Sequence, residues 1–442
     1  MSEVENRTVR KIMWRLIPFL IACYFVAFID RTNVSFAKLQ MNSALGLSET
    51  AYGFGAGLFF VGYFFLEVPS NLALHRFGAR LWIARIMISW GVVSGLFAFV
   101  GPIARTLGLS NEMTFYALRF LLGVCEAGFF PGVIFYLTLW FPSAYRARVT
   151  SFFMLAIPIS QVIGAPISGA LLGVSGAGLD GWQWLFILEA VPSILMAFGV
   201  LFYLIDRPAL AGWLQEDERT WLQGRLDQET HLKTAHHGYL SLLKSISDPR
   251  ILAGSIVYFA QNATGYGVSF FLPTIIKNFG VSNFQTGLLA TLPPICAAIG
   301  MVSLCYNSDR TLRRREHVAL ALLIATIGVG GAGLVSSPVL ILCLLCVGQF
   351  GSSAVAPLYW PIPNTFLTGA SAAAGIAAIN ALGNLAGFGG PYVMGYFKEL
   401  TGGFTVGLLI LAACALIGAA VAITLSVDSR VEASGAQPAP AG

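Results

Sequence analysis

Four ionisable residues lie inside long apolar stretches of this sequence, where charge is rare. Asp30 and Arg31 are neighbours in one stretch, and Arg119 and Glu126 share another. A charged side chain inside a bilayer is costly, so such residues usually face a water-filled cavity, where they pair with each other or bind a substrate or an ion. These four residues are therefore the candidates for chemistry in this chain.

The spacing of Arg119 and Glu126 places both side chains on one face of a helix, roughly 10 Å apart. Gly123 between them leaves room for a ligand. The alternative interpretation is that the four residues form two buried ion pairs that only lock two helices together. The second half of the chain offers neutral polar groups in place of charges: Gln261, Asn262, Gln349, Trp360, Asn364, Asn380 and Asn384. Together the two sets predict a cavity with charge on one wall and hydrogen-bonding groups on the other.

The elements that carry these residues are predicted from composition. Of the 442 residues, 56% are hydrophobic and 11% are charged, whereas soluble domains carry roughly 25% charged residues. A membrane-spanning helix needs about 20 mainly apolar residues, because lipid offers no partner for free backbone groups. Twelve such runs are predicted: 15–36, 51–74, 82–101, 114–138, 149–172, 182–205, 250–272, 284–305, 317–335, 338–362, 371–395 and 403–426. The expected fold is an all-α integral membrane protein of two six-helix bundles.

A charged stretch between Asp206 and Arg250 divides the chain into six helices plus six. The predicted parts are an N-terminus (1–14), a first bundle (15–205), a central loop (206–249), a second bundle (250–426) and a disordered polar tail (427–442). Most of the 26 lysines and arginines flank the helices on one side, and the exceptions on the other side are Lys38, Arg105, Lys277 and Lys398. The positive-inside rule therefore predicts that both termini and the central loop are cytoplasmic.

Several other functions are disfavoured by the sequence. The net charge of +5 is explained by the basic flanks of the helices, so no nucleic-acid partner is expected. Cys343 and Cys346 form a CxxC pair, but without a neighbouring histidine or acid a metal or redox role is not expected. No nucleophile with an adjacent base and no GxxxxGK loop is visible, which argues against an embedded enzyme and an ATP-driven pump. The expected ligands are lipid and protons, with no metal or other cofactor, and the expected state is a monomer.

Prolines and glycines within two predicted helices indicate that these helices can bend or move during transport. Pro166 follows Gly164 in the fifth predicted helix, and Pro391 follows Gly390 in the eleventh. The two prolines stand about half the chain apart, which indicates a weak internal repeat. Paired halves with the binding site between them are typical of alternating-access carriers, although close helix packing explains each glycine separately.

The motifs resemble those of the major facilitator superfamily and, within it, the anion:cation symporter family, from about residue 10 to residue 425. The matching stretches are Ile29–Val34, Glu67–Asn71, His75–Arg80, Arg119–Gly123, Trp140–Pro142, Leu272–Ile276, Ser308–Arg310 and Ala373–Ala377, together with Glu126 and Pro131. The chain departs from the superfamily pattern at Asn71 and His75, where glycine and aspartate are usual, and at Cys305, where glycine is usual.

The resemblance implies a role for each matching residue. Arg31 and Arg119 would hold a carboxylate substrate, since an arginine fork binds a carboxylate bidentately and stays charged. Asp30 and Glu126 would take up protons. The positions that resemble neutral contacts of the cavity are Tyr63, Gln161, Trp360 and Asn380, and those that resemble cytoplasmic gates are Arg76, Arg80, Asp309 and Arg310. The gate arginines are expected to bind carbonyl oxygens at helix C-termini.

The implied activity is import of a small organic carboxylate, such as a sugar acid, a dicarboxylate or an aromatic acid, by proton symport in a bacterial inner membrane. The inside-negative potential repels an anion by about 2.3 kcal/mol per charge per 100 mV, and at least one co-transported proton removes that penalty. When substrate occupies an arginine, the acid that held it protonates more readily, so the two ligands favour each other's binding. Asp30 is likewise expected to hold an arginine in its charged form. Exchange or export of an organic anion by the same fold is the open alternative.

Overall fold

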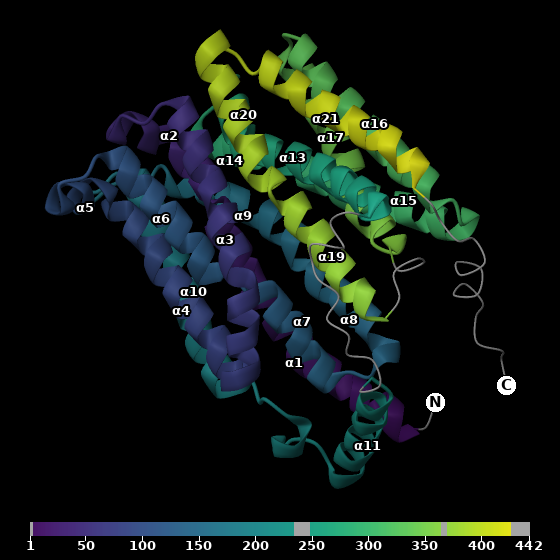
Figure 1. Cartoon of the computed structure of the whole chain (residues 1–442). Helices are drawn as coiled ribbons and strands as arrows, with labels where there is room; N and C mark the ends of the chain where they lie inside the picture. Colours follow the sequence, from purple (N-terminus) through teal and green to yellow (C-terminus); the bar gives the residue numbers. More distant parts are fainter. Residues whose placement is uncertain (1–2, 234–247, 364–368, 426–442) are drawn as a thin grey trace. The chain divides into compact units, whose positions relative to one another are not determined.

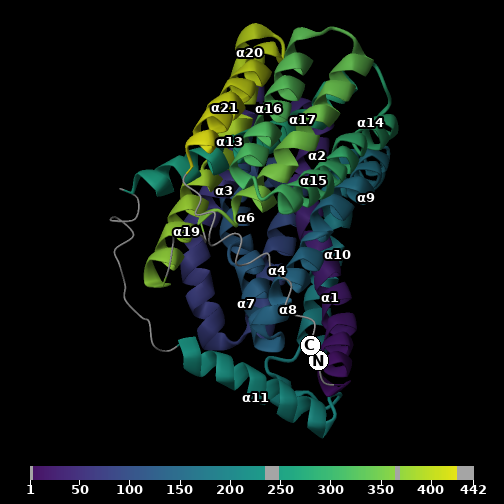
Figure 2. The same cartoon turned by 90° about the vertical axis from the view of Figure 1, so that its right-hand side faces the viewer.

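The computed structural model describes residues 3–233, 248–363 and 369–425, which are mostly helical (Figures 1 and 2). Within these ranges the only extended pairing is a single bridge between Gly176 and Leu179. Nine helical stretches of the described chain are long and apolar enough to cross a membrane, the first at Glu3–Leu45 and the last at Thr405–Thr424. The prediction of an all-α membrane protein is confirmed, whereas the number twelve and the side of the termini stay predictions.

Helices also cover the three predicted spans that are not among these nine stretches. The helices concerned are α3 (Glu49–Phe77) over 51–74, α13 (Pro249–Lys277) over 250–272, and α19 (Gly369–Asn384) with α20 (Ala386–Thr401) over 371–395. Their helical form agrees with the apolar pattern from which they were predicted.

The chain forms two compact units, and the first comprises residues 1–46 and 58–236. Besides most of α3 and two short 3-10 turns at Phe97–Phe99 and Pro208–Leu210, its helices are α1 (Glu3–Thr32), α2 (Val34–Leu45), α4 (Ala79–Leu96), α5 (Val100–Leu107), α6 (Asn111–Glu126), α7 (Phe129–Trp140), α8 (Ser143–Met154), α9 (Ala156–Leu171), α10 (Gly181–Tyr203) and α11 (Glu216–Lys233). Helix α1 packs against α8, α9, α10 and α11. Its residues therefore reach several neighbours, which is why charges on α1 can meet charges on distant parts of the sequence.

The second unit comprises residues 47–57 and 237–442. Besides α13, α19 and α20, its helices are α14 (Asn283–Leu289), α15 (Leu292–Thr311), α16 (Arg314–Leu334), α17 (Pro338–Tyr359) and α21 (Thr405–Thr424). The start of α3 belongs to this unit because glycine lets it approach α20 closely: a Cβ atom on Gly53 would lie 2.4 Å from the Pro391 carbonyl oxygen. An ion pair between Lys398 Nζ and Glu49 Oε1, 2.6 Å long, joins the same two helices.

The predicted helix over 114–138 is interrupted, and the interruption has a steric cause. α6 ends at Glu126 and α7 begins at Phe129, with Gly128 between them in the left-handed region at φ +88°. A Cβ atom on Gly128 would lie 2.2 Å from the Ser70 hydroxyl oxygen of α3. Glycine is thus required both by the backbone conformation and by the close approach of α3, and the break leaves Glu126 at the last turn of its helix.

The predicted central loop, 206–249, is partly helical. Its acidic stretch begins α11, where Glu216, Asp217 and Glu218 occupy the first turn, a position that favours negative charge. Both views place α11 beside the N-terminal part of α1 (Figures 1 and 2). Residues 234–247 of this loop and the predicted tail at 427–442 lie outside the described residues.

Candidate functional site

Arg31 and Glu126 form a buried ion pair between α1 and α6. The Arg31 Nε atom donates to Glu126 Oε1 over 3.0 Å, and the Nη2 atom of the same guanidinium donates to the same oxygen. The two residues are 8% and 2% exposed. A charge-assisted bond of this kind fixes both side chains, and it shows that the partner of Arg31 is Glu126.

Asp30 has different partners from those expected. Its carboxylate accepts hydrogen bonds from Trp90 Nε1 (3.2 Å), from the Ser94 hydroxyl (2.8 Å) and from the Ser193 hydroxyl. All three donors are neutral, so the expectation that Asp30 holds an arginine is wrong. The reason is geometric: side chains of adjacent helical residues point in directions about 100° apart, so Arg31 faces α6 while Asp30 faces α4 and α10.

Aromatic rings lie against both arginines. The Arg31 guanidinium lies over the rings of Phe28, Phe59 and Tyr63 at 5.3, 5.2 and 5.7 Å, and that of Arg119 lies 5.4 Å from the Phe59 ring. Arg119 itself is 1% exposed. Cation–π contacts stabilise arginine where water is excluded. Tyr63, predicted as a neutral contact, is therefore placed against the predicted arginine site.

Gly123 does not leave room for a ligand. A Cβ atom at this position would lie 2.0 Å from the Phe59 carbonyl oxygen and 2.9 Å from the Tyr63 amide nitrogen. The backbone of α3 occupies the space that a side chain at this position would need, so the glycine allows α3 and α6 to touch. The expectation that Gly123 leaves space for a ligand is therefore wrong, because α3 packs into that space.

Three further charged residues of the first unit lie in or beside apolar stretches, and the sequence analysis missed their placement. Glu189 on α10 is 6% exposed and accepts a hydrogen bond from the Ser168 hydroxyl over 2.7 Å. Lys38, expected in an outer loop, is 3% exposed within α2, and Glu67 is half-buried within α3. The signal that found Asp30, a charge inside an apolar run, is also present at Glu67 and Glu189.

The other residues predicted to line the cavity lie on α9 and in the second unit. Gln161 is half-buried on α9. In the second unit Trp360 packs edge-on against the Tyr258 ring at 5.1 Å, and Asn380 is half-buried on α19. Asn262 donates to the Gly383 carbonyl oxygen over 3.2 Å, which is the role of helix packing, and Asn364 lies outside the described residues.

Three of the predicted gate residues contact aromatic rings or a charged neighbour. Within the described residues, the guanidinium groups of Arg76 and Arg310 lie over the neighbouring rings of Phe77 and Tyr306, at 5.6 Å each. No bond from either guanidinium to a helix C-terminal carbonyl is found among the residues that the structure describes, so the gating role stays a prediction. Asp309 pairs with Arg314 over 2.9 Å.

Arg80 contributes through its backbone. Its amide donates to Asp206 Oδ1 over 2.8 Å, next to Gly78 at φ +89°. Asp206 thereby caps the first turn of α4, where a carboxylate satisfies a free amide and meets the positive end of the helix dipole.

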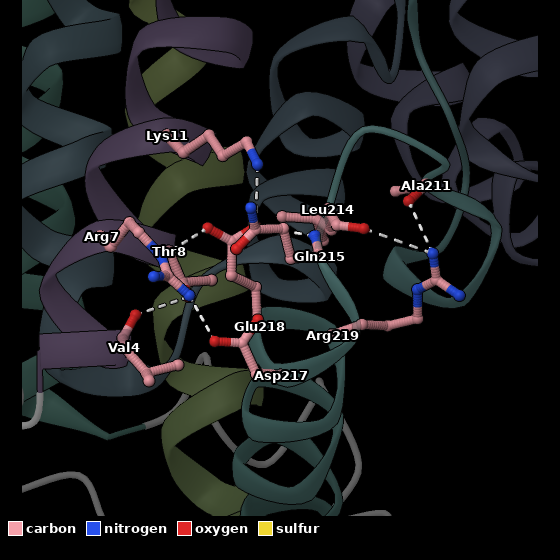
Figure 3. Close-up of polar contacts among 10 residues, drawn as sticks. All are labelled: Val4, Arg7, Thr8, Lys11, Ala211, Leu214, Gln215, Asp217, Glu218 and Arg219. Atoms are coloured by element: carbon pink, nitrogen blue, oxygen red, sulfur yellow. Dashed lines mark hydrogen bonds and ion pairs between the residues drawn. The ribbon is translucent and has the colours of Figure 1, made fainter.

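A second polar cluster joins the two ends of the first unit's sequence. Glu218, whose side chain is 1% exposed, accepts from Arg7 Nε (3.1 Å) and from Lys11 Nζ (2.9 Å), and Asp217 binds the same arginine (Figure 3). Burial opposes ionisation of Glu218, but the hydrogen bonds from Lys11, the Gln215 amide and Arg7 outweigh it and lower the pKa of this carboxyl. We refer to Arg7, Lys11, Asp217 and Glu218 as the Glu218 cluster.

Comparison with known proteins places the chain in a family. Its sequence matches the Major Facilitator Superfamily over residues 20–391 and 254–441. It is 48% identical over 427 residues to an Agrobacterium vitis protein with the provisional name tartrate transporter, covering 96% of both chains. It is 40% identical over 435 residues to a quinolone resistance transporter of Acinetobacter baumannii, covering 97% of both. A solved bacterial homologue of the human lysosomal transporter Spinster shares the fold, with a TM-score of 0.75 over 100% of both chains at 16% identity. The chain therefore belongs to the major facilitator superfamily and is a multi-pass membrane transport protein rather than an enzyme.

Proposed function

We propose that the protein imports a small organic carboxylate together with protons by alternating access. The observation that carries this proposal is the buried Arg31–Glu126 pair, with Arg119 on the same helix as Glu126. Two arginines held among aromatic rings supply fixed positive charge for an anion, and the acid beside them can exchange a proton. The tartrate name of the 48% identical relative supports a dicarboxylate as the first substrate to test.

The coupling step follows from competition for Arg31. A substrate carboxylate that binds Arg31 takes the place of Glu126, because one guanidinium face cannot serve both anions. Glu126 is then a buried carboxylate without its cation, and it becomes neutral by taking a proton. Substrate and proton are therefore bound together, and loss of the proton on the other side restores the pair and expels the substrate. By thermodynamic linkage each ligand raises the affinity for the other by the same factor.

The remaining assignments belong to the same proposal. Asp30 is a second acid for proton binding, and the neutral contacts are Tyr63, Gln161, Trp360 and Asn380. The residues proposed to control closure of one side are Arg76, Arg80, Asp309 and Arg310. The protein is further proposed to be a monomer of twelve spans in a bacterial inner membrane, with both termini and the central loop in the cytoplasm, as the positive-inside rule predicts.

Uptake by proteoliposomes tests this function. Vesicles that contain the purified protein, with an alkaline and substrate-free lumen, are placed in acidic buffer with labelled tartrate, a labelled sugar acid or a labelled aromatic acid. Accumulation above the outside concentration, abolished by a protonophore, is the expected result for at least one of them. Empty vesicles are the control, and a protein that accumulates none of the three classes contradicts the proposal.

Exchange or export is the second candidate, and the name of the quinolone resistance relative favours including it. An obligatory exchanger gives no net uptake into substrate-free vesicles but takes up label when unlabelled substrate is loaded inside. An exporter of a drug instead accumulates the drug in the lumen of inside-out vesicles when that lumen is acidic. The two assays separate these activities from symport.

A further inference from the structure

Glu189 is a buried acid with an incomplete set of hydrogen bonds. Its Oε1 atom accepts from the Ser168 hydroxyl over 2.7 Å, while Oε2 has no hydrogen-bond partner among the described residues. The residue is 6% exposed. An ionised carboxylate oxygen without a donor is costly at such depth, so the geometry disfavours the charged form of this side chain.

Glu189 lies beside Asp30. Ser193, which donates to Asp30 Oδ2, stands four residues after Glu189 and therefore on the same face of α10. Asp30 is 1% exposed and has three neutral donors. Asn33 is also adjacent to Glu189, and neither its side-chain nitrogen nor its oxygen makes a hydrogen bond within the described part of the chain.

The helices around Asp30 and Glu189 carry few charged side chains. α4 meets Asp30 with Trp90 and Ser94, and the sequence of α9 contains no ionisable residue. α2 carries the buried Lys38. On α1, Arg31 is engaged by Glu126, so neither Asp30 nor Glu189 forms an ion pair among the described residues.

Two neighbouring carboxyl groups that are buried and form no ion pair among the described residues do not both ionise, and they share one proton. The hydrogen bonds decide which group holds it. Three donors stabilise the charged form of Asp30, whereas Glu189 has one donor and one oxygen without a partner. We propose that Asp30 and Glu189 form one proton-binding pair, distinct from the Arg31–Glu126 pair, and that Glu189 holds the proton at rest.

A proton fits this site better than a metal cation. Both oxygens of Asp30 already face O–H or N–H hydrogens, whereas a sodium ion needs oxygen lone pairs directed at it. The neutral Glu189 needs a single acceptor at most for its O–H group, and the adjacent Asn33 side-chain oxygen, which has no hydrogen bond among the described residues, is available to accept it. A role of this pair in transport rests on the proposed proton symport, but its proton occupancy does not.

Infrared spectroscopy of the purified full-length protein tests the pair without substrate or gradient. A protonated carboxyl group has a carbonyl stretching band that the ionised form lacks. Glu189→Gln is expected to remove one such band at neutral pH. A spectrum of folded Glu189→Gln that keeps every carboxyl band of the wild type overturns the proposal.

A second variant keeps Glu189 and changes its hydrogen bond. Ser168→Ala removes the donor to Oε1, so the Glu189 band should shift to higher frequency, as it does for a carbonyl group without a hydrogen bond. Ser160→Ala is the matched control, because Ser160 lies on the same helix and donates to the Ile157 carbonyl oxygen. An unchanged band in Ser168→Ala, or an equal shift in both variants, contradicts the assignment.

A sodium control and a comparison with substrate transport complete the test. Replacing choline chloride by sodium chloride at constant pH should leave the band unchanged, and loss of the band in sodium would identify a sodium site and overturn the proton site. A protein that keeps the Glu189 band but fails to accumulate substrate contradicts the proposed symport alone. A protein that accumulates substrate with protons but lacks the band contradicts the Asp30–Glu189 pair alone.

Discussion

At the scale of single residues, the main result is that the adjacent side chains of Asp30 and Arg31 have different binding partners. Arg31 binds Glu126, whereas Asp30 binds neutral donors. Opposite charges next to each other in sequence thus serve two separate sites, because a helix turns them toward different neighbours. In the proposed mechanism an anionic substrate displaces Glu126 from Arg31, whereas Asp30 keeps its three neutral donors.

Arg119→Ala tests the substrate clamp. Loss of a buried guanidinium removes charge-assisted hydrogen bonds of about 1.5–3 kcal/mol, which corresponds to roughly a 10- to 150-fold loss of affinity. Titration calorimetry of the detergent-purified protein with tartrate measures the change. Arg105→Ala, at an exposed arginine of α5, is the control, and equal affinity of wild type and Arg119→Ala would remove this residue from the site.

Glu126→Gln tests proton coupling. The amide resembles the protonated acid in shape and charge, so exchange of labelled for unlabelled substrate should persist while accumulation driven by a pH gradient is lost. Both are measured in proteoliposomes. Glu112→Gln is a suitable control because Glu112 is exposed and accepts a hydrogen bond from the Tyr116 hydroxyl over 2.7 Å on the same helix. Wild-type accumulation by Glu126→Gln excludes this residue from the proton path.

At the scale of helices, close contacts between backbones hold the charged residues in place. α3 and α6 touch at Gly123, and the α6–α7 break fits around Gly128 and Ser70. These contacts position Glu126 at the end of α6 and Phe59 under both arginines. Small residues at helix interfaces are the usual means of close packing in membranes.

Gly123→Ala should destabilise the protein. The added methyl group would overlap the Phe59 carbonyl oxygen, and overpacking of this kind costs about 1–3 kcal/mol. The melting temperature in detergent should fall and substrate affinity should weaken, because Phe59 moves with α3. Gly95→Ala is the matched control, since its new Cβ atom would make an ordinary 3.6 Å contact with Ala190. A Gly123→Ala protein as stable as Gly95→Ala would disprove the packing role.

The Glu218 cluster predicts how α11 responds to pH. The pKa of Glu218 is lowered in the folded protein, so its stabilising contribution is present above the ordinary pKa of glutamate and is lost as the pH falls through the folded value. Hydrogen exchange of α11, corrected for intrinsic rates, should therefore speed up in acid for the wild type. Glu218→Gln should exchange fast at both pH values.

The control for this experiment lies on the same helix. Asp227→Asn changes an exposed acid of α11 and should behave like the wild type. Slow exchange of α11 in Glu218→Gln at neutral pH would mean that the ion pairs with Arg7 and Lys11 do not hold the helix, as is common for pairs with exposed partners.

At the scale of the whole molecule, the apolar pattern predicts the helices well, but it does not predict which side chains contact each other across helices. The runs around α1, α6 and α10 are long enough to be found from composition, and charges inside them reveal Asp30, Arg31, Arg119 and Glu126. Their pairing depends on helix rotation and on contacts such as that of Gly123 with Phe59, which no local pattern encodes. Glu189 is different: it also lies within an apolar run, so the same pattern marks it, although it was not among the four candidates.

The central claim is that substrate and proton cross together through the Arg31–Glu126 site, and the proton flux that accompanies substrate measures this most directly. Proteoliposomes with a pH-sensitive dye inside, and no imposed gradient, receive tartrate or the best substrate of the panel outside. Substrate should acidify the lumen in vesicles with wild-type protein, and not in vesicles with Arg119→Ala or Glu126→Gln. Uptake of labelled substrate without acidification would contradict the claim.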